Sequence, residues 1–257
     1  MLLTERLMAG ERVFSAWSSV PDSLNAEGLA ATPFDAVCLD MQHGAHHEDS
    51  VMRCLGPIIA SGKPGLVRVP VDRFDMAARA LDFGAQAVIA PMVNSVADAR
   101  AFAQSMKYPP VGKRSWGPHL AMGRSGFSGP QSAWLDEANR KTLAFAMIET
   151  REALDAVDEI LAVAGIDGVF VGPSDFSIAL TDGKAVDPSL ESMMEAIAHI
   201  SARAQAVGKH AGIYVVDPKL VQRYSAMGYR LFALGNEQNY MERGAAALLA
   251  DAGALTS

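Results

Sequence analysis

The sequence lacks several features that would place it in a specialised class of protein. Its 257 residues contain only two cysteines, Cys38 and Cys54. Both lie in apolar surroundings, so we expect free buried thiols rather than a disulfide. No uncharged apolar run reaches the length of a membrane span, and the opening MLLTERLMAGERVF carries charges inside its apolar stretch, unlike a signal peptide. We therefore expect a cytoplasmic protein without a membrane partner.

Positive charge is also scarce, since 22 Lys and Arg stand against 29 Asp and Glu, which gives a formal net charge of −7. The absence of a Lys/Arg tract argues against a nucleic-acid partner. No linker or low-complexity stretch divides the chain. Because 50% of the residues are hydrophobic, the chain can build a substantial core, and we expect residues 1–257 to form a single domain.

Eight short apolar runs recur along the chain, each followed by a turn signal and a helical pattern. Such runs are typical of parallel strands that are buried on both faces. The predicted strands span residues 12–19, 34–41, 65–70, 86–93, 143–149, 167–173, 210–216 and 230–236. Amphipathic segments between them predict helices, among them 75–85, 151–163, 189–208 and 218–228.

Eight strands that alternate with helices in about 250 residues predict a (β/α)8 (TIM) barrel. A doubly wound open sheet is the alternative, but it would favour a glycine-rich phosphate turn after the first strand. That turn, SAWSSVPDS, has no glycine, so we expect a barrel and no nucleotide cofactor. The connection from 94 to 142 is unusually long, and we expect its segment 108–130 to serve binding or assembly.

Polar residues gather at the C-terminal ends of the predicted strands, where barrel enzymes carry their chemistry. They are Trp17, Ser18, Asp40, Gln42, His43, Arg68, Glu149, Ser174, Asp175, Asn236 and Glu237. This convergence indicates an active site more strongly than any one of these residues does.

Arg68, in LVRVP, is a guanidinium among apolar neighbours, which is costly to bury without an anionic partner. One interpretation is a structural ion pair with a carboxylate of the barrel. The other is a clamp on a substrate carboxylate or oxyanion, because the planar guanidinium binds such groups with two hydrogen bonds.

Glu149 and Asp175 each follow a strand and precede a helix, where an acid is also ordinary helix-start chemistry. They emerge from neighbouring predicted strands, and two carboxylates directed into one cavity repel unless a proton or a cation separates them. Mg2+ accepts two carboxylates and completes its coordination with water and substrate oxygens. The pair is therefore a candidate divalent-metal site.

The stretch VCLDMQHGAHHEDS, residues 37–50, contains three of the six histidines. His43 lies three residues after Asp40, and an Asp–His pair at the barrel mouth can orient an imidazole as a general base. His46 and His47 fall in the following polar turn, so we expect both to be solvated. The H-x-x-H-H cluster contains no thiolate, which disfavours a zinc site.

Lysine placement bears on the mechanism. Lys63, Lys141 and Lys209 precede their strands, and no lysine falls near the C-terminal end of a predicted strand. A Schiff-base mechanism is therefore disfavoured, and metal stabilisation of an enolate is the better candidate.

Six motifs in order closely resemble the HpcH/HpaI aldolase family: FDAVCLDMQHG, VRVP, LDFGAQAVIAPMV, YPPVGKRS, IETREALD and GVFVGPSDFS. These are class II, metal-dependent pyruvate aldolases, typified by 4-hydroxy-2-oxoheptanedioate aldolase and 2-dehydro-3-deoxyglucarate aldolase. The resemblance runs from about residue 5 to 248. It implies a (β/α)8 barrel of the phosphoenolpyruvate/pyruvate superfamily, assembled as a homohexamer, a trimer of dimers that exchange a C-terminal helix.

The resemblance also implies catalytic roles. Glu149 and Asp175 correspond to the metal ligands, with Mg2+ or Mn2+ as the cofactor and Co2+ or Zn2+ as alternatives. His43 corresponds to the base, Asp40 to its partner and Arg68 to the arginine that binds the enolate. Asp82 corresponds to an acid that relatives supply across a subunit boundary. The implied substrate-binding residues are Trp17, Gln42, Arg68, Gly172, Pro173, Ser174, Asp175 and Tyr214.

The implied reaction is reversible aldol cleavage and addition of 4-hydroxy-2-oxo acids, with pyruvate or hydroxypyruvate as donor and an aldehyde as acceptor. The sequence departs from heptanedioate-cleaving relatives, which tend to have D-G-E-H where Asp40-Met41-Gln42-His43 stands and R-G-x-G where RSWGP stands. The sequence therefore does not identify the natural aldehyde.

Two alternative functions are a CoA-thioester lyase of the citrate lyase β-subunit-like branch and a non-catalytic barrel. The first would need basic residues near the mouth, for which Lys113, Arg114 and Arg124 are the candidates.

Overall fold

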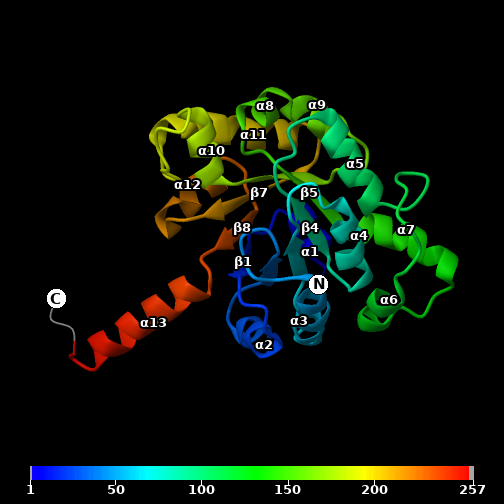
Figure 1. Ribbon diagram of the computed structural model, residues 1–257, viewed down its shortest axis with the longest axis horizontal. Coiled ribbons are helices and arrows are strands. Elements are labelled where there is room, and N and C mark those ends of the chain that lie inside the picture. Colours follow the sequence, from blue (N-terminus) through cyan, green and yellow to red (C-terminus); the bar gives the residue numbers. More distant parts are fainter. Residues whose placement is uncertain (1, 255–257) are drawn as a thin grey trace.

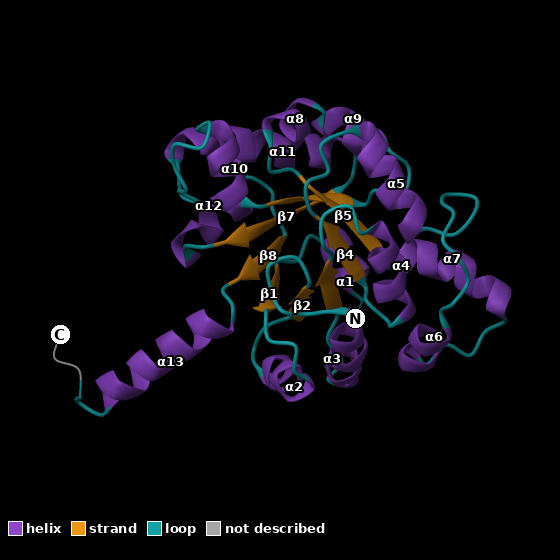
Figure 2. Cartoon of the chain, in the orientation of Figure 1, coloured by secondary structure: helices purple, strands orange, loops and turns teal. Residues whose placement is uncertain are grey.

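Eight short runs of apolar residues form a closed parallel barrel in the structure, a computed structural model that describes residues 2–254 (Figures 1 and 2). Each strand pairs with the next, and the last pairs with the first. The strands are β1 (Val13–Ser18), β2 (Ala36–Asp40), β3 (Gly65–Arg68), β4 (Ala87–Ala90), β5 (Leu143–Met147), β6 (Gly168–Val171), β7 (His210–Val215) and β8 (Leu231–Leu234). All eight lie within the predicted ranges, so the (β/α)8 barrel is confirmed and the open sheet is excluded.

Helices surround the barrel, as the amphipathic segments predicted (Figure 2). They are α1 (Leu3–Met8), α2 (Ser23–Ala31), α3 (Glu48–Ala60), α4 (Phe74–Asp82), α5 (Val96–Met106), α6 (His119–Ser125), α7 (Gln131–Lys141), α8 (Arg151–Asp155), α9 (Val157–Ala162), α10 (Pro173–Leu180), α11 (Met194–Ala206), α12 (Val221–Ala226) and α13 (Glu237–Asp251), with 3-10 turns at Glu191–Met193 and Pro218–Leu220. The segment predicted as one helix over 151–163 is interrupted at Ala156.

The alternation of side chains along the strands divides the core in two. In β2, Cys38 belongs to the cluster inside the barrel, whereas Val37 and Leu39 belong to the layer between strands and helices. Leu3 and Leu7 of α1 join the inner cluster, so the N-terminal end of the barrel is closed by apolar side chains. The functional cavity must therefore open at the other end. Cys38 and Cys54 are buried free thiols, as expected.

The long connection between β4 and β5 holds three helices. After α5, residues 107–118 lead to α6, which packs against α3 and α4, and then to α7. Arg124 ties α6 to the barrel helices, because its guanidinium donates to the carbonyl oxygens of Met52 and Phe83.

The C-terminal helix α13 extends away from the barrel, and residues 241–250 are all exposed (Figure 1). Within residues 2–254, no helix combines the length and hydropathy needed to cross a membrane.

Candidate active site

A cavity of about 260 Å3 opens at the C-terminal ends of the strands. Seven strands contribute to it, either directly or through the loops that follow them. It is lined by Trp17, Ser19, Asp40, His43, Arg68, Met147, Phe170, Gly172, Pro173, Ser174, Asp175, Tyr214 and Asn236. Ten of the residues selected from the sequence therefore meet at one place: Trp17, Asp40, His43, Arg68, Gly172, Pro173, Ser174, Asp175, Tyr214 and Asn236.

Asp40 and Arg68 form a bidentate ion pair at the base of this cavity. They are opposite each other in the register of β2 and β3, and the Nε and Nη2 groups of Arg68 donate to the two carboxylate oxygens at 2.8 and 2.7 Å. Burial raises the pKa of Asp40, but the hydrogen bonds and charge of Arg68 outweigh it, so the net pKa lies below its usual value. Asp40 is therefore ionised at neutral pH.

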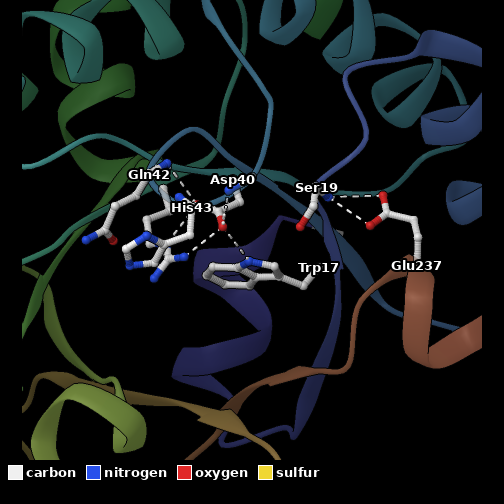
Figure 3. A network of polar contacts seen from close by, with 8 residues as sticks. Trp17, Ser19, Asp40, Gln42, His43 and Glu237 are labelled. Atoms are coloured by element: carbon white, nitrogen blue, oxygen red, sulfur yellow. Dashed lines mark hydrogen bonds and ion pairs between the residues drawn. The ribbon is translucent and has the colours of Figure 1, made fainter. Parts of the chain in front are cut away.

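The same carboxylate organises the loop that follows β2. The backbone N–H groups of Gln42, His43 and Gly44 donate to it at 3.0, 3.4 and 3.0 Å, and the indole of Trp17 donates at 3.2 Å (Figure 3). Within the described chain, no hydrogen bond joins the carboxylate to the His43 ring. Asp40 thus fixes the main chain that carries His43, whereas the sequence suggested direct orientation of the imidazole.

Aromatic side chains from β1 and β7 form one wall of the cavity. The Arg68 guanidinium lies 4.9 Å from the centroid of the Trp17 ring, in cation–π geometry. Tyr214 packs edge-on against Trp17, with ring centroids 5.3 Å apart. Burial raises the pKa of Tyr214, so its hydroxyl is protonated at neutral pH.

Glu149 lies behind Gly172 and is only 1% exposed. One carboxylate oxygen, Oε1, accepts the backbone N–H of Met92 at 2.9 Å, whereas Oε2 has no hydrogen-bond partner in the described chain. Burial raises the pKa of Glu149 to about 7, and the charge of Asp175 adds to the rise. A buried carboxylate oxygen without a donor is costly, and a cation beside Asp175 would remove that cost.

The residues around Glu149 leave room for such a group. Gly172 has no side chain, and a Cβ there would lie 2.3 Å from Oε2 of Glu149. Gly172 also precedes α10, whose first turn contains Pro173, Ser174 and Asp175. Among the described residues, no cluster of three or more His, Cys, Asp or Glu is arranged to hold a metal. A cation on Glu149 and Asp175 would therefore need water or substrate oxygens as its remaining ligands.

The expectation that His46 is solvated is wrong. Its side chain is buried, and its ring nitrogens lie 3.0 Å from the Ser18 hydroxyl and 3.1 Å from the Ser50 hydroxyl. Within the polar turn, the His46 ring alone turns inward to the end of β1 while its neighbours Ala45 and His47 face water, which the sequence pattern could not reveal. His47 is exposed, as expected.

Ser18 and Glu237 also take part in this buried network and do not line the cavity. The Ser18 hydroxyl donates to Glu237 at 2.7 Å, and Glu237 also accepts from the backbone of Ser19 and Val20 and from the side chain of Asn25. The residue that faces the cavity after β1 is Ser19, which the sequence reasoning missed. Strand alternation was the available signal, because Trp17 and Ser19 point to the same face.

Three further expectations concern residues outside the cavity lining. Asp82 lies at the end of α4 that leads into β4, at the opposite end of the barrel, and pairs with Arg114 at 2.7 Å. Gln42 is near Asp40, but its side chain does not line the cavity, and its Oε1 is buried without a partner. Of the basic candidates for a CoA site, Arg114 is buried beside Asp82 and Arg124 binds backbone carbonyls.

A closed barrel whose carboxylates, arginine and histidine meet at the C-terminal ends of its strands is the arrangement of a TIM-barrel enzyme. The model of the family described as HpcH/HpaI aldolase/citrate lyase matches residues 14–242. The chain belongs to this family, as its motifs indicated, and it is a carbon–carbon lyase.

Individual relatives cover nearly the whole chain. A hydroxypyruvate/pyruvate aldolase of Rhizorhabdus wittichii is 37% identical over 246 residues, which are 96% of each chain. A 4-hydroxy-2-oxo-heptane-1,7-dioate aldolase of Salmonella arizonae is 33% identical over 97% of this chain and 94% of that one. Among solved structures, an HpcH/HpaI aldolase from Desulfitobacterium hafniense superposes with a TM-score of 0.85 at 25% identity, covering 97% of both chains.

Proposed function

We propose that the protein catalyses the reversible, metal-dependent aldol cleavage and addition of 4-hydroxy-2-oxo acids, with pyruvate or hydroxypyruvate as enolate donor. The observation that carries this proposal is the orphaned Oε2 of Glu149, buried beside Asp175 at the edge of a small polar cavity. The names of relatives at 33% to 37% identity agree with aldol chemistry on these donors.

Glu149 and Asp175 fit a divalent cation, because both are carboxylates and one of their oxygens lacks a donor. Mg2+ or Mn2+, with Co2+ or Zn2+ as alternatives, would be held there and would stabilise the charge of the pyruvate enolate. A solved citrate lyase β subunit from M. tuberculosis, 16% identical, is described as a complex with oxaloacetate and magnesium, but at that identity the likeness is limited to the fold.

The protein's own groups would divide the remaining work. Gly172 and the first turn of α10 would offer the backbone N–H groups of Gly172, Ser174 and Asp175 to the keto-acid carboxylate, since Pro173 has none. Arg68 would stabilise the keto oxygen with the part of its guanidinium that Asp40 does not occupy, since Nη1 has no partner in the described chain. Trp17 and Tyr214 would exclude water from one wall.

His43 would act as the general base in cleavage, removing the proton from the aldol hydroxyl, and would return that proton to the alkoxide in synthesis. It lines the cavity and is exposed enough to exchange protons with solvent. Asp40 supports this role through the backbone of residues 42–44.

We also propose that the protein works as a homo-oligomer in the cytoplasm, with a hexamer of exchanged C-terminal helices as the family resemblance implies. The exposure of α13 supports this proposal, because Met241 is 67% exposed and Leu248 is 72% exposed on a helix that leaves the barrel (Figure 1). Asp82 lies far from the cavity of its own chain, so only a second subunit could bring it to an active site.

Proton exchange tests the proposed chemistry without any knowledge of the acceptor. The protein is incubated with pyruvate in D2O, and the methyl protons are followed by NMR with Mn2+ or Mg2+ and then with EDTA. We expect exchange that requires the metal and that is lost in Glu149→Gln. Folded protein that exchanges no protons with any of these metals would refute the enolate mechanism.

A further inference from the structure

Ser19 holds an unusual position at the cavity wall. Its backbone N–H donates to both oxygens of Glu237, at 2.8 and 3.1 Å, and its carbonyl accepts the N–H of Ala45 at 2.9 Å. Its hydroxyl, by contrast, has no hydrogen bond within the described chain. Figure 3 shows Ser19 between Asp40 and Glu237, with the dashed contacts to Glu237 on one side. A fixed backbone therefore presents a free hydroxyl to the cavity.

Ser19 lies across the barrel from Glu149. In a closed ring of eight strands, β1 is opposite β5, the strand that leads to Glu149, whereas β7 and β8 are its near neighbours. Tyr214 and Asn236, at the ends of β7 and β8, line the cavity beside Ser19. If the donor keto acid occupies the Glu149 side of the cavity, the acceptor aldehyde faces Ser19.

The size of the cavity limits that acceptor. At about 260 Å3 it lies just below the usual range of small-molecule pockets, about 300–1,000 Å3. A short aldehyde can fit in the space that a keto acid of three carbons leaves. Hydroxyl groups at the wall favour an acceptor that can exchange hydrogen bonds with them.

On the basis of the proposed aldol reaction, we propose that the Ser19 hydroxyl contacts the acceptor and selects short hydroxyaldehydes, and that Glu237 positions Ser19 for this contact. Ser19 is then a specificity-determining residue, and Glu237 acts only through it. Neither assignment follows from the metal site or from the His43 base.

Glu237 is suited to positioning because its carboxylate is saturated with donors. It accepts from the Ser18 hydroxyl at 2.7 Å, from the Asn25 amide at 2.8 Å and from the backbone of Ser19 and Val20. The Ser18 hydroxyl, which donates to Glu237, also lies 3.0 Å from His46 Nε2, so the imidazole joins the same network. The network joins the end of β1 to three elements: α2 through Asn25, the loop before α3 through His46, and the start of α13 through Glu237.

A matched pair of acceptors tests the Ser19 contact. Glycolaldehyde and acetaldehyde differ by one hydroxyl, and kcat/KM is measured for each with pyruvate and Mn2+. We expect Ser19→Ala to lower the glycolaldehyde-to-acetaldehyde ratio by about 3- to 10-fold, the effect of one lost neutral hydrogen bond. Ser61→Ala, on the exposed end of α3, is the control and should leave the ratio unchanged. An unchanged ratio in Ser19→Ala would overturn the assignment.

A double-mutant cycle tests the role of Glu237. Glu237→Gln places an amide N–H group against the four groups that donate to Glu237, so we expect it to lower the glycolaldehyde-to-acetaldehyde ratio. When Glu237→Gln is combined with Ser19→Ala, we expect the ratio to fall no further than in Ser19→Ala alone. Equal losses for both aldehydes, or an additive fall in the ratio, would show a merely structural role. Ser18→Ala, which removes one donor with little change in volume, should lower the ratio in the same direction if Glu237→Gln does not fold.

Exchange of the pyruvate methyl protons separates this inference from the reaction on which it rests. Metal-dependent exchange in the wild-type protein, together with an unchanged aldehyde ratio in Ser19→Ala, would overturn the inference and leave the aldol function intact. Absence of exchange in the wild-type protein would overturn both.

Discussion

Arg68 and Asp40 face each other across β3 and β2 and share two hydrogen bonds, yet Arg68 keeps 11% of its side chain exposed toward the cavity. Both interpretations of this arginine are therefore compatible, because one edge of the guanidinium serves the ion pair and the remaining Nη1 is available to a ligand. A structural ion pair thus holds a ligand-binding group in a fixed orientation.

Removal of one partner should destabilise the fold. Asp40→Ala leaves the Arg68 charge buried without its anion, so we expect the free energy of unfolding to fall by about 3–5 kcal/mol in urea titrations. Asp75→Ala is the matched control, since Asp75 forms the same bidentate geometry with Arg73 at the surface and should change little. Similar losses in the two variants would contradict the importance of burial.

Gly172→Ala should impair metal binding. The added Cβ would lie 2.3 Å from Oε2 of Glu149, so the carboxylate must move. We expect the affinity for Mn2+, measured by calorimetry, to fall by about 10–100-fold. Gly123→Ala, where a Cβ meets no atom within 4 Å, should retain the wild-type affinity. Wild-type affinity in Gly172→Ala would show that Glu149 does not bind the metal.

His43→Ala should lower the rate of aldol cleavage by about 10²–10⁴-fold, because the general base is lost. The rate is followed by coupling the release of pyruvate to a reporter reaction. His47→Ala is the comparison, since His47 is exposed four residues further along and lies outside the cavity. Equal rates in the two variants would assign the base to another group.

Strand and helix periodicity was enough to predict the barrel and the end that holds the cavity, because backbone geometry sets both. The same reasoning placed Asp40, Arg68 and Asp175 at the cavity, since Asp40 and Arg68 end β2 and β3 and Asp175 follows β6 in the first turn of α10. It named Ser18 and missed Ser19, although strand alternation places Ser19 on the same face as Trp17. The burial of His46 also escaped it, because its partner Ser18, and Glu237 to which Ser18 donates, are remote in sequence and meet only in the folded barrel.

The C-terminal helix offers a test of assembly. Met241, Leu248 and Leu249 are exposed on α13, and such a surface favours a second copy of the chain. We expect Leu248→Glu combined with Leu249→Glu to lower the molar mass measured by light scattering after size-exclusion chromatography. Arg100→Glu, on the exposed side of α5, controls for a change of charge. An identical mass in all variants would exclude these residues from the interface.

His46 should make stability depend on pH. Burial lowers the pKa of His46 from 6.5 to about 4, although the charges of Glu237 and Asp40 oppose the fall and His47 adds to it. Because the folded pKa lies below the unfolded one, the unfolded chain binds the proton first, and stability is lost as pH falls from about 6.5 to about 4. The full loss is about 3 kcal/mol, from 2.5 units at about 1.36 kcal/mol each. His46→Asn should flatten this part of the pH profile of unfolding, whereas His47→Asn should preserve it. Parallel profiles for the wild-type protein and His46→Asn would show that His46 is already charged in the folded state.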